Sequence, residues 1–159
     1  MKNIVFLLAF LVGCASVPIG QATSASGTVD VRGASKKQIY QKALQWLTYK
    51  FVSGKAVVDY KDPDAGRIIA KGDLVIPMQV GSRAEVHVIA TIDCVAGRSR
   101  IMVEATDCAS VAPNGTRWPC TSMYVYPSSI EEIKASPVKF VEDFRDYMTG
   151  GSAPAWDGR

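Results

Sequence analysis

Four cysteines and one histidine, His87, are the residues with the greatest capacity for chemistry in this chain. A nucleophilic cysteine needs a base beside it. His87, however, is predicted on the opposite face of a strand from Cys94. One histidine cannot build a zinc site of ordinary composition, and Cys108 and Cys120 lack the Cys-x-x-Cys spacing that would add ligands. The sequence therefore predicts no catalytic residue and no metal.

Carboxylates also cluster in one short segment. Asp59, Asp62 and Asp64 occupy positions that suit calcium, but the closing glutamate of a twelve-residue calcium loop is missing. The run from Asp62 to Gly66 is typical of a turn. No Gly-x-Ser-x-Gly elbow, phosphate loop or dinucleotide fingerprint occurs. We therefore expect no cofactor and no enzyme activity; an envelope hydrolase is an alternative that lacks an acid–base pair.

The N-terminal segment has the features of a lipoprotein signal peptide. A short basic start precedes the apolar run Ile4–Val12, which is too short to span a bilayer, since spanning needs about 20 residues. Small and apolar residues stand before Cys14, as in a lipobox. We predict that residues 1–13 are removed and that Cys14 carries acyl chains such as palmitate. The alternatives are an uncleaved apolar N-terminus or an ordinary signal cut near Ala22 or Ala25.

The segment that follows predicts how the domain is tethered. Residues 14–27 are rich in serine, alanine and glycine and lack charge, which is typical of a flexible tether. Ala15 stands where an aspartate would favour the inner membrane of a Gram-negative cell. We therefore expect an envelope location, anchored in the outer membrane and facing the periplasm.

Residues 28–149 are predicted to form one α+β domain of β-α-β-β-β-β-α order, with residues 150–159 as a loose tail. Apolar residues at helical spacing predict a first helix with Ser35 as its N-cap, and Ser136-Pro137 is typical of the start of a second. The predicted helices and strands are 28–32 (strand), 36–51 (helix), 56–61, 67–77, 85–95 and 98–107 (strands) and a helix from 136 to 148. The segment before the second helix is mostly loop, with a short extra strand at 123–126 as an alternative.

A two-residue turn at Ala96-Gly97 sets the predicted register of the central hairpin. It pairs Val95 with Arg98, and hence Ile92 with Ile101, Ala90 with Val103, Val88 with Ala105, Asp93 with Arg100 and His87 with Thr106. The resulting sheet has one apolar face, which two helices can cover. Its other face carries four apolar residues that we predict as an interaction face, namely Ile69, Val75, Ile89 and Met102.

The same register predicts the disulfide pairing. Cys94 and Cys108 fall on opposite faces and about nine strand residues apart, roughly 30 Å. A disulfide needs Cα atoms within ~7 Å. Cys108 and Cys120 bracket a turn-rich loop, so we predict that these two are paired and that Cys94 is a buried free thiol.

Two segments resemble a known family. They are the helix KQIYQKALQWL, residues 37–47, and the hairpin YKDPDAGRIIAKG, residues 60–72. Together they are similar to uncharacterised bacterial lipoproteins and secreted proteins with a TBP-like fold. The resemblance extends over most of residues 28–148 and implies a fold, but no activity.

Charge argues against a nucleic-acid partner. The predicted uncovered face carries two positive and four negative side chains, whereas nucleic-acid binding depends on phosphate neutralisation. We hypothesise a lipoprotein that binds an envelope protein, or itself, through this face. The alternative is a carrier of a small apolar ligand or lipid in a cavity lined by Trp46, Phe51, Phe140 or Phe144.

Overall fold

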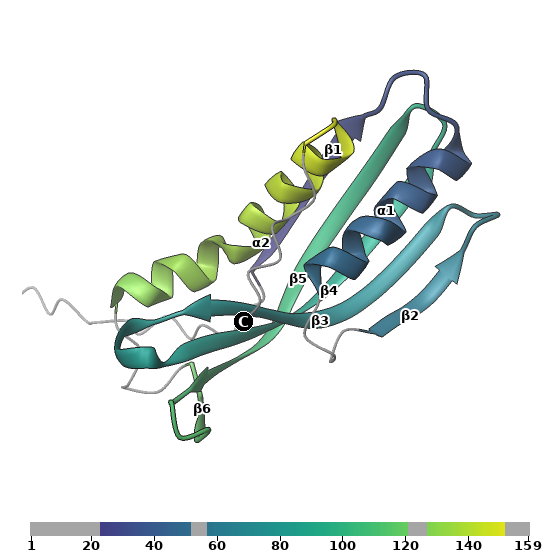
Figure 1. Cartoon of the computed structure of the whole chain (residues 1–159). Helices are drawn as coiled ribbons and strands as arrows, with labels where there is room; N and C mark the ends of the chain where they lie inside the picture. Colours follow the sequence, from purple (N-terminus) through teal and green to yellow (C-terminus); the bar gives the residue numbers. More distant parts are fainter. Residues whose placement is uncertain (1–22, 52–56, 121–126, 152–159) are drawn as a thin grey trace, which may run out of the picture.

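The computed structural model describes residues 23–51, 57–120 and 127–151. An antiparallel sheet of order β1-β5-β4-β3-β2, with β6 also on β5, carries both helices on one face (Figure 1). This confirms the predicted α+β architecture. The elements are β1 (Ser24–Asp30), α1 (Lys36–Lys50), β2 (Val57–Asp62), β3 (Arg67–Pro77), the 3₁₀ turn η1 (Gln79–Gly81), β4 (Arg83–Val95), β5 (Arg98–Val111), β6 (Arg117–Pro119) and α2 (Pro127–Met148).

Local chemistry starts α1 where the sequence predicts. The Ser35 hydroxyl accepts a hydrogen bond from the Gln38 amide, and the Gln38 side chain accepts one from the Ser35 amide at 2.8 Å. This reciprocal arrangement satisfies two amides that a helix start leaves free. The backbone amide of Gly97 donates to the Ala34 carbonyl, which ties the β1–α1 connection to the β4–β5 turn.

Aromatic rings fill the space between the helices and the sheet. The Trp46 ring meets Phe140 and Phe144 edge to face, with centroids 4.8 and 4.9 Å apart, and Phe51 lies 5.5 Å from Phe140. All four side chains are buried. Because these rings occupy the volume that an apolar ligand would need, their packing gives the carrier hypothesis no support.

Two glycines let a residue of α2 and the residue that follows α1 approach the sheet closely. A Cβ added to Gly27 of β1 would lie 2.5 Å from Val141 Cγ1 of α2. A Cβ added to Gly72 of β3 would lie 2.5 Å from the Phe51 ring. These close contacts seat α2 over β1, and Phe51 over β3.

Several predicted boundaries are displaced. β1 begins at Ser24, so residues 24–27 of the predicted tether are part of the sheet edge. β4 and β5 run to Arg83 and Val111, beyond the predicted 85 and 107. The predicted strand at 123–126 lies outside the described residues, and β6 was not predicted.

The second helix does not begin at Ser136. α2 already starts at Pro127, and Pro137 lies inside it. Proline lacks the amide that would bond to the carbonyl four residues earlier, that of Ile133. The Ser136 hydroxyl donates to that carbonyl instead, at 2.7 Å. This replacement bond keeps a buried acceptor satisfied, so the helix continues through the proline.

A β-bulge in β5 changes the predicted facing of its second half. The register follows the prediction from the turn as far as Val88–Ala105, but His87 then pairs with Asp107 rather than Thr106. The extra residue is Thr106. Because one inserted residue reverses which side chains face the core, Cys108 turns to the helix side, opposite Val86. The prediction that Cys94 and Cys108 lie on opposite faces is therefore wrong.

Candidate functional site: the outer face of the sheet

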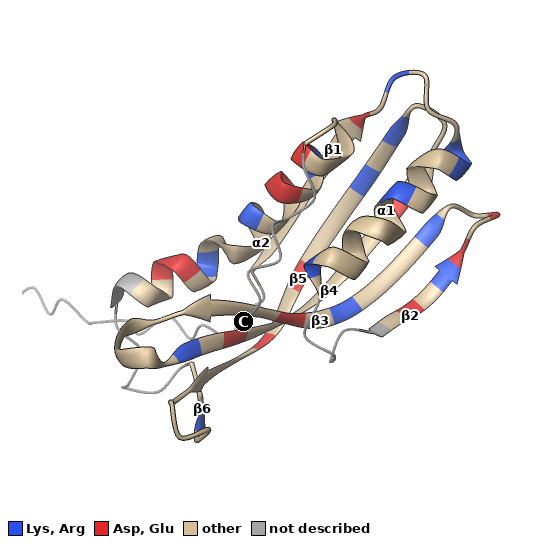
Figure 2. Ribbon diagram, in the orientation of Figure 1, with Lys and Arg blue, Asp and Glu red and all other residues tan. Residues whose placement is uncertain are grey.

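The sheet face turned away from α1 and α2, here called the outer face, is the best candidate site. Figure 2 shows basic and acidic residues interleaved along its strands. The register puts Tyr60, Ile69, Thr91 and Met102 in one row across β2, β3, β4 and β5. A mixed face of this kind is suited to a partner with both apolar and polar groups.

Three of the four predicted interaction residues meet on this face. Ile69 and Met102 flank Thr91, and Ile89 stands in the next row, between Lys71 and Glu104. Val75 is 51% exposed but lies two rows further along, beside Glu85. The predicted set is thus a cluster of three and a separate valine.

Sequence alternation missed one member of the cluster. Tyr60 should point to the core, but a bulge between Val58 and Tyr60 places Tyr60 opposite Ile69, and its side chain is 46% exposed. We define the outer-face cluster as Tyr60, Ile69, Ile89 and Met102. The residues around Asp59 are mostly polar, and nothing in their pattern indicates the bulge.

Ion pairs border the cluster on both sides. Arg67 bonds to Asp93 through Nε at 2.6 Å, and this hydrogen bond and the Asp93 charge raise the pKa of the guanidinium. On the other side, Lys71 lies 2.7 Å from Asp59. Exposed pairs of this kind contribute little to stability because solvent screens them, so they shape the rim rather than stabilise the fold.

The β2–β3 turn explains the aspartates that resemble calcium ligands. Asp62 Oδ1 accepts hydrogen bonds from the amides of Asp64 and Ala65, and Oδ2 accepts one from the Tyr60 hydroxyl. The Ala65 amide, then the Tyr60 hydroxyl, hold the pKa of the Asp62 carboxyl below its ordinary value. The hydrogen bond between the Tyr60 hydroxyl and Asp62 also raises the pKa of Tyr60. Asp62 is therefore engaged by its own turn.

His87 has one partner of the kind that catalytic histidines use. Its Nδ1 donates to Asp73 at 2.8 Å across β3 and β4. In the described ranges, no hydroxyl or thiol bonds to the other ring nitrogen, and no group of three or more metal-binding side chains forms. The absence of an active site and of a metal stays a prediction.

A buried carboxylate lies at the end of the outer face, where no buried acid was expected. Glu85 is only 6% exposed and is held by Arg83 Nε at 2.9 Å and by Arg117 of β6 at 2.6 Å. Burying a charge is costly unless it is paired. The two arginines supply that pairing, and Arg117 thereby ties β6 across β5 to β4.

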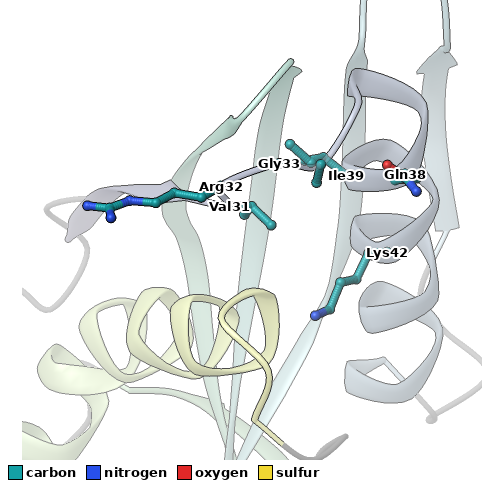
Figure 3. Close-up of a pocket in the computed structure, with 7 residues that line it drawn as sticks. Val31, Arg32, Gly33, Gln38, Ile39 and Lys42 are labelled. Atoms are coloured by element: carbon teal, nitrogen blue, oxygen red, sulfur yellow. The ribbon is translucent and has the colours of Figure 1, made fainter.

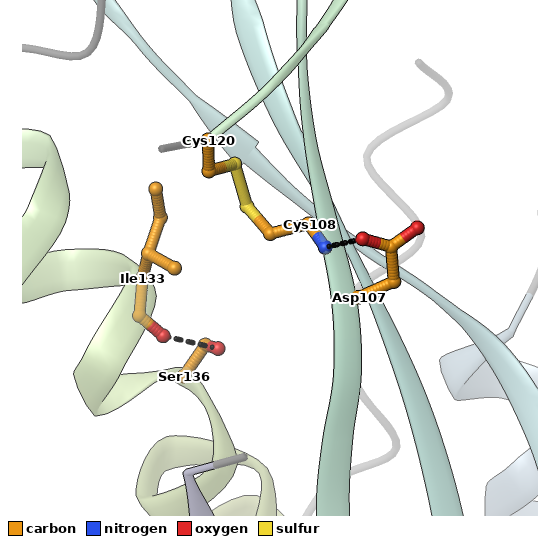
Figure 4. Close-up of a disulfide and its surroundings, with 5 residues drawn as sticks. All are labelled: Asp107, Cys108, Cys120, Ile133 and Ser136. Atoms are coloured by element: carbon orange, nitrogen blue, oxygen red, sulfur yellow. Dashed lines mark hydrogen bonds between the residues drawn. A yellow bond between two sulfur atoms is a disulfide. The ribbon is translucent and has the colours of Figure 1, made fainter. Parts of the chain in front are cut away.

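The predicted disulfide is present on the other face. Cys108 and Cys120 are joined with Cα atoms 5.4 Å apart, and Figure 4 shows the bridge between β5 and Ile133 of α2. Cys94 is free and buried, as predicted. Burial raises the pKa of its thiol, which disfavours the reactive thiolate.

A shallow hollow of about 340 Å³ lies between the β1–α1 connection and α1. Figure 3 shows that the Arg32 guanidinium points away from it and that Gln38 turns aside. Lys42 donates to the Met148 carbonyl at the end of α2. Because its polar side chains are directed elsewhere, the hollow offers a ligand little recognition.

The predicted anchor, Cys14, lies outside the described residues. Among the helices of the described part, neither is long and apolar enough to cross a membrane.

Comparisons with known proteins identify the domain. The profile of a domain of unknown function (DUF4468) with TBP-like fold matches residues 26–104. A DUF4468 family protein from Bacteroides ovatus superposes with a TM-score of 0.59 at 14% identity, over 82% of this chain and 87% of that one. A TBP-like protein from Parabacteroides distasonis gives 0.59 at 13% identity, over 82% and 95%. No curated protein matches. The chain therefore belongs to the DUF4468 family, whose domain has a TBP-like fold and no known function.

Proposed function

We propose that this chain is a bacterial envelope lipoprotein, anchored in the outer membrane through Cys14, whose domain binds another protein with the outer face of its sheet. The observation that carries the proposal is the outer-face cluster: Tyr60, Ile69, Ile89 and Met102 gather on a face that neither helix covers. Apolar patches rimmed by polar groups are common at protein interfaces.

The rim favours a protein partner over a nucleic acid. Arg67, Lys71 and Arg98 each pair with an aspartate on the same face, with N–O distances of 2.6 to 2.8 Å. Cations that are already neutralised release fewer counterions when they meet phosphate, so they add little to nucleic-acid affinity. A partner that buries the apolar cluster and leaves these ion pairs at its edge fits the face better.

The role proposed for the domain is non-enzymatic. The ring of His87 is held by Asp73, whereas the thiol of Cys94 is buried on the opposite side of the sheet among core residues. The two groups with most catalytic potential are thus separated by the sheet. No acid–base pair supports the hydrolase alternative.

In-cell photo-cross-linking tests the proposal. A benzoyl-phenylalanine at Thr91, in the centre of the outer-face row, is compared with one at the exposed Gln41 of α1. We expect Thr91 to capture one recurrent envelope protein that Gln41 does not capture. Capture of the same background proteins from both positions would contradict binding through the outer face.

A matched pair of variants strengthens the test. Ile89→Asp puts a charge into the cluster, whereas Val138→Asp puts one at a 50% exposed valine on α2. The purified captured protein should bind Ile89→Asp at least tenfold more weakly, equivalent to about 1.4 kcal/mol, and bind Val138→Asp as tightly as wild type. Equal affinity for all three would refute the assignment of the site. Circular dichroism confirms that both variants fold.

A further inference from the structure

The direction in which the chain enters the domain indicates which end faces a lipid anchor. β1 is antiparallel to β5, Ser24 pairs with Glu104, and the Thr23 carbonyl accepts a hydrogen bond from the Ala105 amide at 3.0 Å. Followed backward from Asp30 to Thr23, the chain therefore runs beside β5 from Arg98 toward Val111. At that end of the sheet Val111 pairs with Arg83.

Two turns with their flanking strand ends form this end of the molecule, and we call it the hairpin end. It comprises residues 77–83, from the end of β3 to the first residue of β4, and residues 111–119, from the end of β5 through β6. The turns approach each other, since a Cβ added to Gly81 would lie 3.6 Å from Pro113 Cγ. Figure 1 shows the N-terminal end of α2 at the same end of the fold.

Chain length limits how far the proposed anchor can lie from the point where the chain enters the sheet. The stretch from Cys14 to Ser24 spans at most about 33–36 Å when fully extended. The strand from Glu104 to Val111 occupies about 23 Å of that length. A fully stretched tether that continues in the direction set at Thr23 therefore passes the hairpin end by only about 10 Å. A membrane that holds Cys14 lies within reach of the hairpin end.

The chemistry of the hairpin end matches an anionic lipid surface. Residues 77–83 and 111–119 include Arg83 and Arg117 and no aspartate or glutamate. Both arginines share the single buried carboxylate of Glu85, so one positive charge remains unbalanced at this end of the molecule. The nearby acids of α2, Glu131 and Glu132, are paired with lysines. The opposite end carries charges of both signs at its turns, with Asp30, Asp62 and Asp64 beside Arg32, Lys36 and Arg98.

Val80 provides an independent observation. It stands at the tip of the β3–β4 turn with 83% of its surface exposed and a φ of 58°. A β-branched residue is strained in that left-handed region, where glycine or asparagine is ordinarily found. In water, this arrangement exposes an apolar side chain at a conformational cost. If the valine inserts among lipid headgroups, its apolar side chain leaves water, which would explain why an exposed and strained valine stands at this tip. Trp118, also at the hairpin end, is of the residue type that favours membrane interfaces.

We propose that the hairpin end rests on anionic phospholipid, with the Val80 tip in the headgroup layer and the outer face of the sheet standing free beside the membrane. The inference rests on the proposed anchor at Cys14. An anchored chain with a second, basic and apolar contact is held more firmly than by lipid alone. The contact also fixes the orientation in which the outer-face cluster meets a partner.

Fluorescence quenching on vesicles tests the orientation. The full lipidated chain carries a fluorophore on Gln79→Cys at the hairpin end or, as the matched control, on Ala96→Cys in the β4–β5 turn at the opposite end. The vesicles contain phosphatidylethanolamine, phosphatidylglycerol and a lipid with a nitroxide headgroup. We expect at least threefold stronger quenching at position 79 than at 96, and loss of that difference on adding Val80→Asp. Thermal melts verify that the variants fold.

The outcomes separate the two proposals. A lipidated chain that floats with vesicles but is quenched equally at both positions, or more at 96, overturns the orientation and leaves the anchor intact. A chain that does not float, like the Cys14→Ser control, overturns the anchor and with it this inference. An unchanged difference in the Val80→Asp variant overturns the role assigned to the valine.

Discussion

The contact between Gly72 and Phe51 makes a sharp prediction about how the helices are seated on the sheet. Gly72 lies in the middle of β3, opposite Val88, and its φ is not in the left-handed region, so the backbone accepts alanine. The obstacle is the neighbouring ring: the new Cβ would stand 2.5 Å from Phe51 Cδ1 and 2.6 Å from Cε1. Unstrained carbon atoms are separated by about 3.5–4.0 Å.

The expected magnitude follows from two opposing effects. Overpacking a core costs about 1–3 kcal/mol, whereas replacing glycine stiffens the unfolded chain and returns about 0.4–1 kcal/mol. Gly72→Ala should therefore lower the free energy of unfolding by about 1–2 kcal/mol. Phe51→Leu removes a buried ring and should itself destabilise the protein, because it takes apolar atoms out of the core. In the Phe51→Leu background, Gly72→Ala should then cost nothing or stabilise the protein.

Urea unfolding followed by circular dichroism measures all four proteins of this double-mutant cycle. The control is Gly27→Ala, which meets Val141 Cγ1 at the same 2.5 Å but has no contact with Phe51 among its neighbours. Phe51→Leu should not rescue it. If the Gly72 and Phe51 substitutions are additive, or if Phe51→Leu rescues both glycine variants equally, the steric argument is refuted.

Three further predictions concern the cysteines and the first turn. Replacing Cys108 and Cys120 by serine removes the cross-link between two residues that are 12 positions apart. The free energy of unfolding from urea titrations should fall by about 3 kcal/mol, and an unchanged midpoint would contradict this. Cys94, whose thiol pKa is raised by burial, should resist an aromatic disulfide reagent at pH 8 until the protein is unfolded, and immediate reaction of the native protein would contradict its burial. The Ala65 amide lowers the folded-state pKa of Asp62 below 3.8, so its contribution is present above that pH and disappears as the pH falls through the folded value. Asp62→Ala should accordingly be less stable than wild type at pH 7, with the difference closing in acid; a constant difference would exclude this linkage.

The sequence was most informative where a turn and an alternating pattern agree. Gly97, with a φ of 76°, fits a two-residue turn, and apolar alternation then fixes every pair from Val95–Arg98 to Val88–Ala105 as predicted. The capped start of α1 at Ser35 is also a local feature. Turn and cap chemistry is contained in a few adjacent residues, so it can be predicted without knowledge of distant contacts.

The errors arise where the local residue pattern does not reveal an irregularity in a strand or a substitute hydrogen bond in a helix. Nothing in the residues around Thr106 or Asp59 marks a bulge, yet each bulge reverses the facing of the strand beyond it. The structure consequently places Tyr60 on the outer face, which the sequence did not predict. Pro137 was interpreted as a helix start on a sound local rule, but the hydroxyl of the adjacent Ser136 satisfies the carbonyl that the proline leaves free.

The bulge at Thr106 has a consequence that links the disulfide to the outer face. By turning Cys108 toward the helices, it places the bond to Cys120 on the core side, next to Ile133. Glu85 and Arg117 meet on the opposite side of the same strands. β6 is thus fixed to the sheet from both faces by two chemically different ties, besides its backbone pairing with β5. Reduction would break only one tie, so the hairpin end should keep its basic surface while its core side loosens.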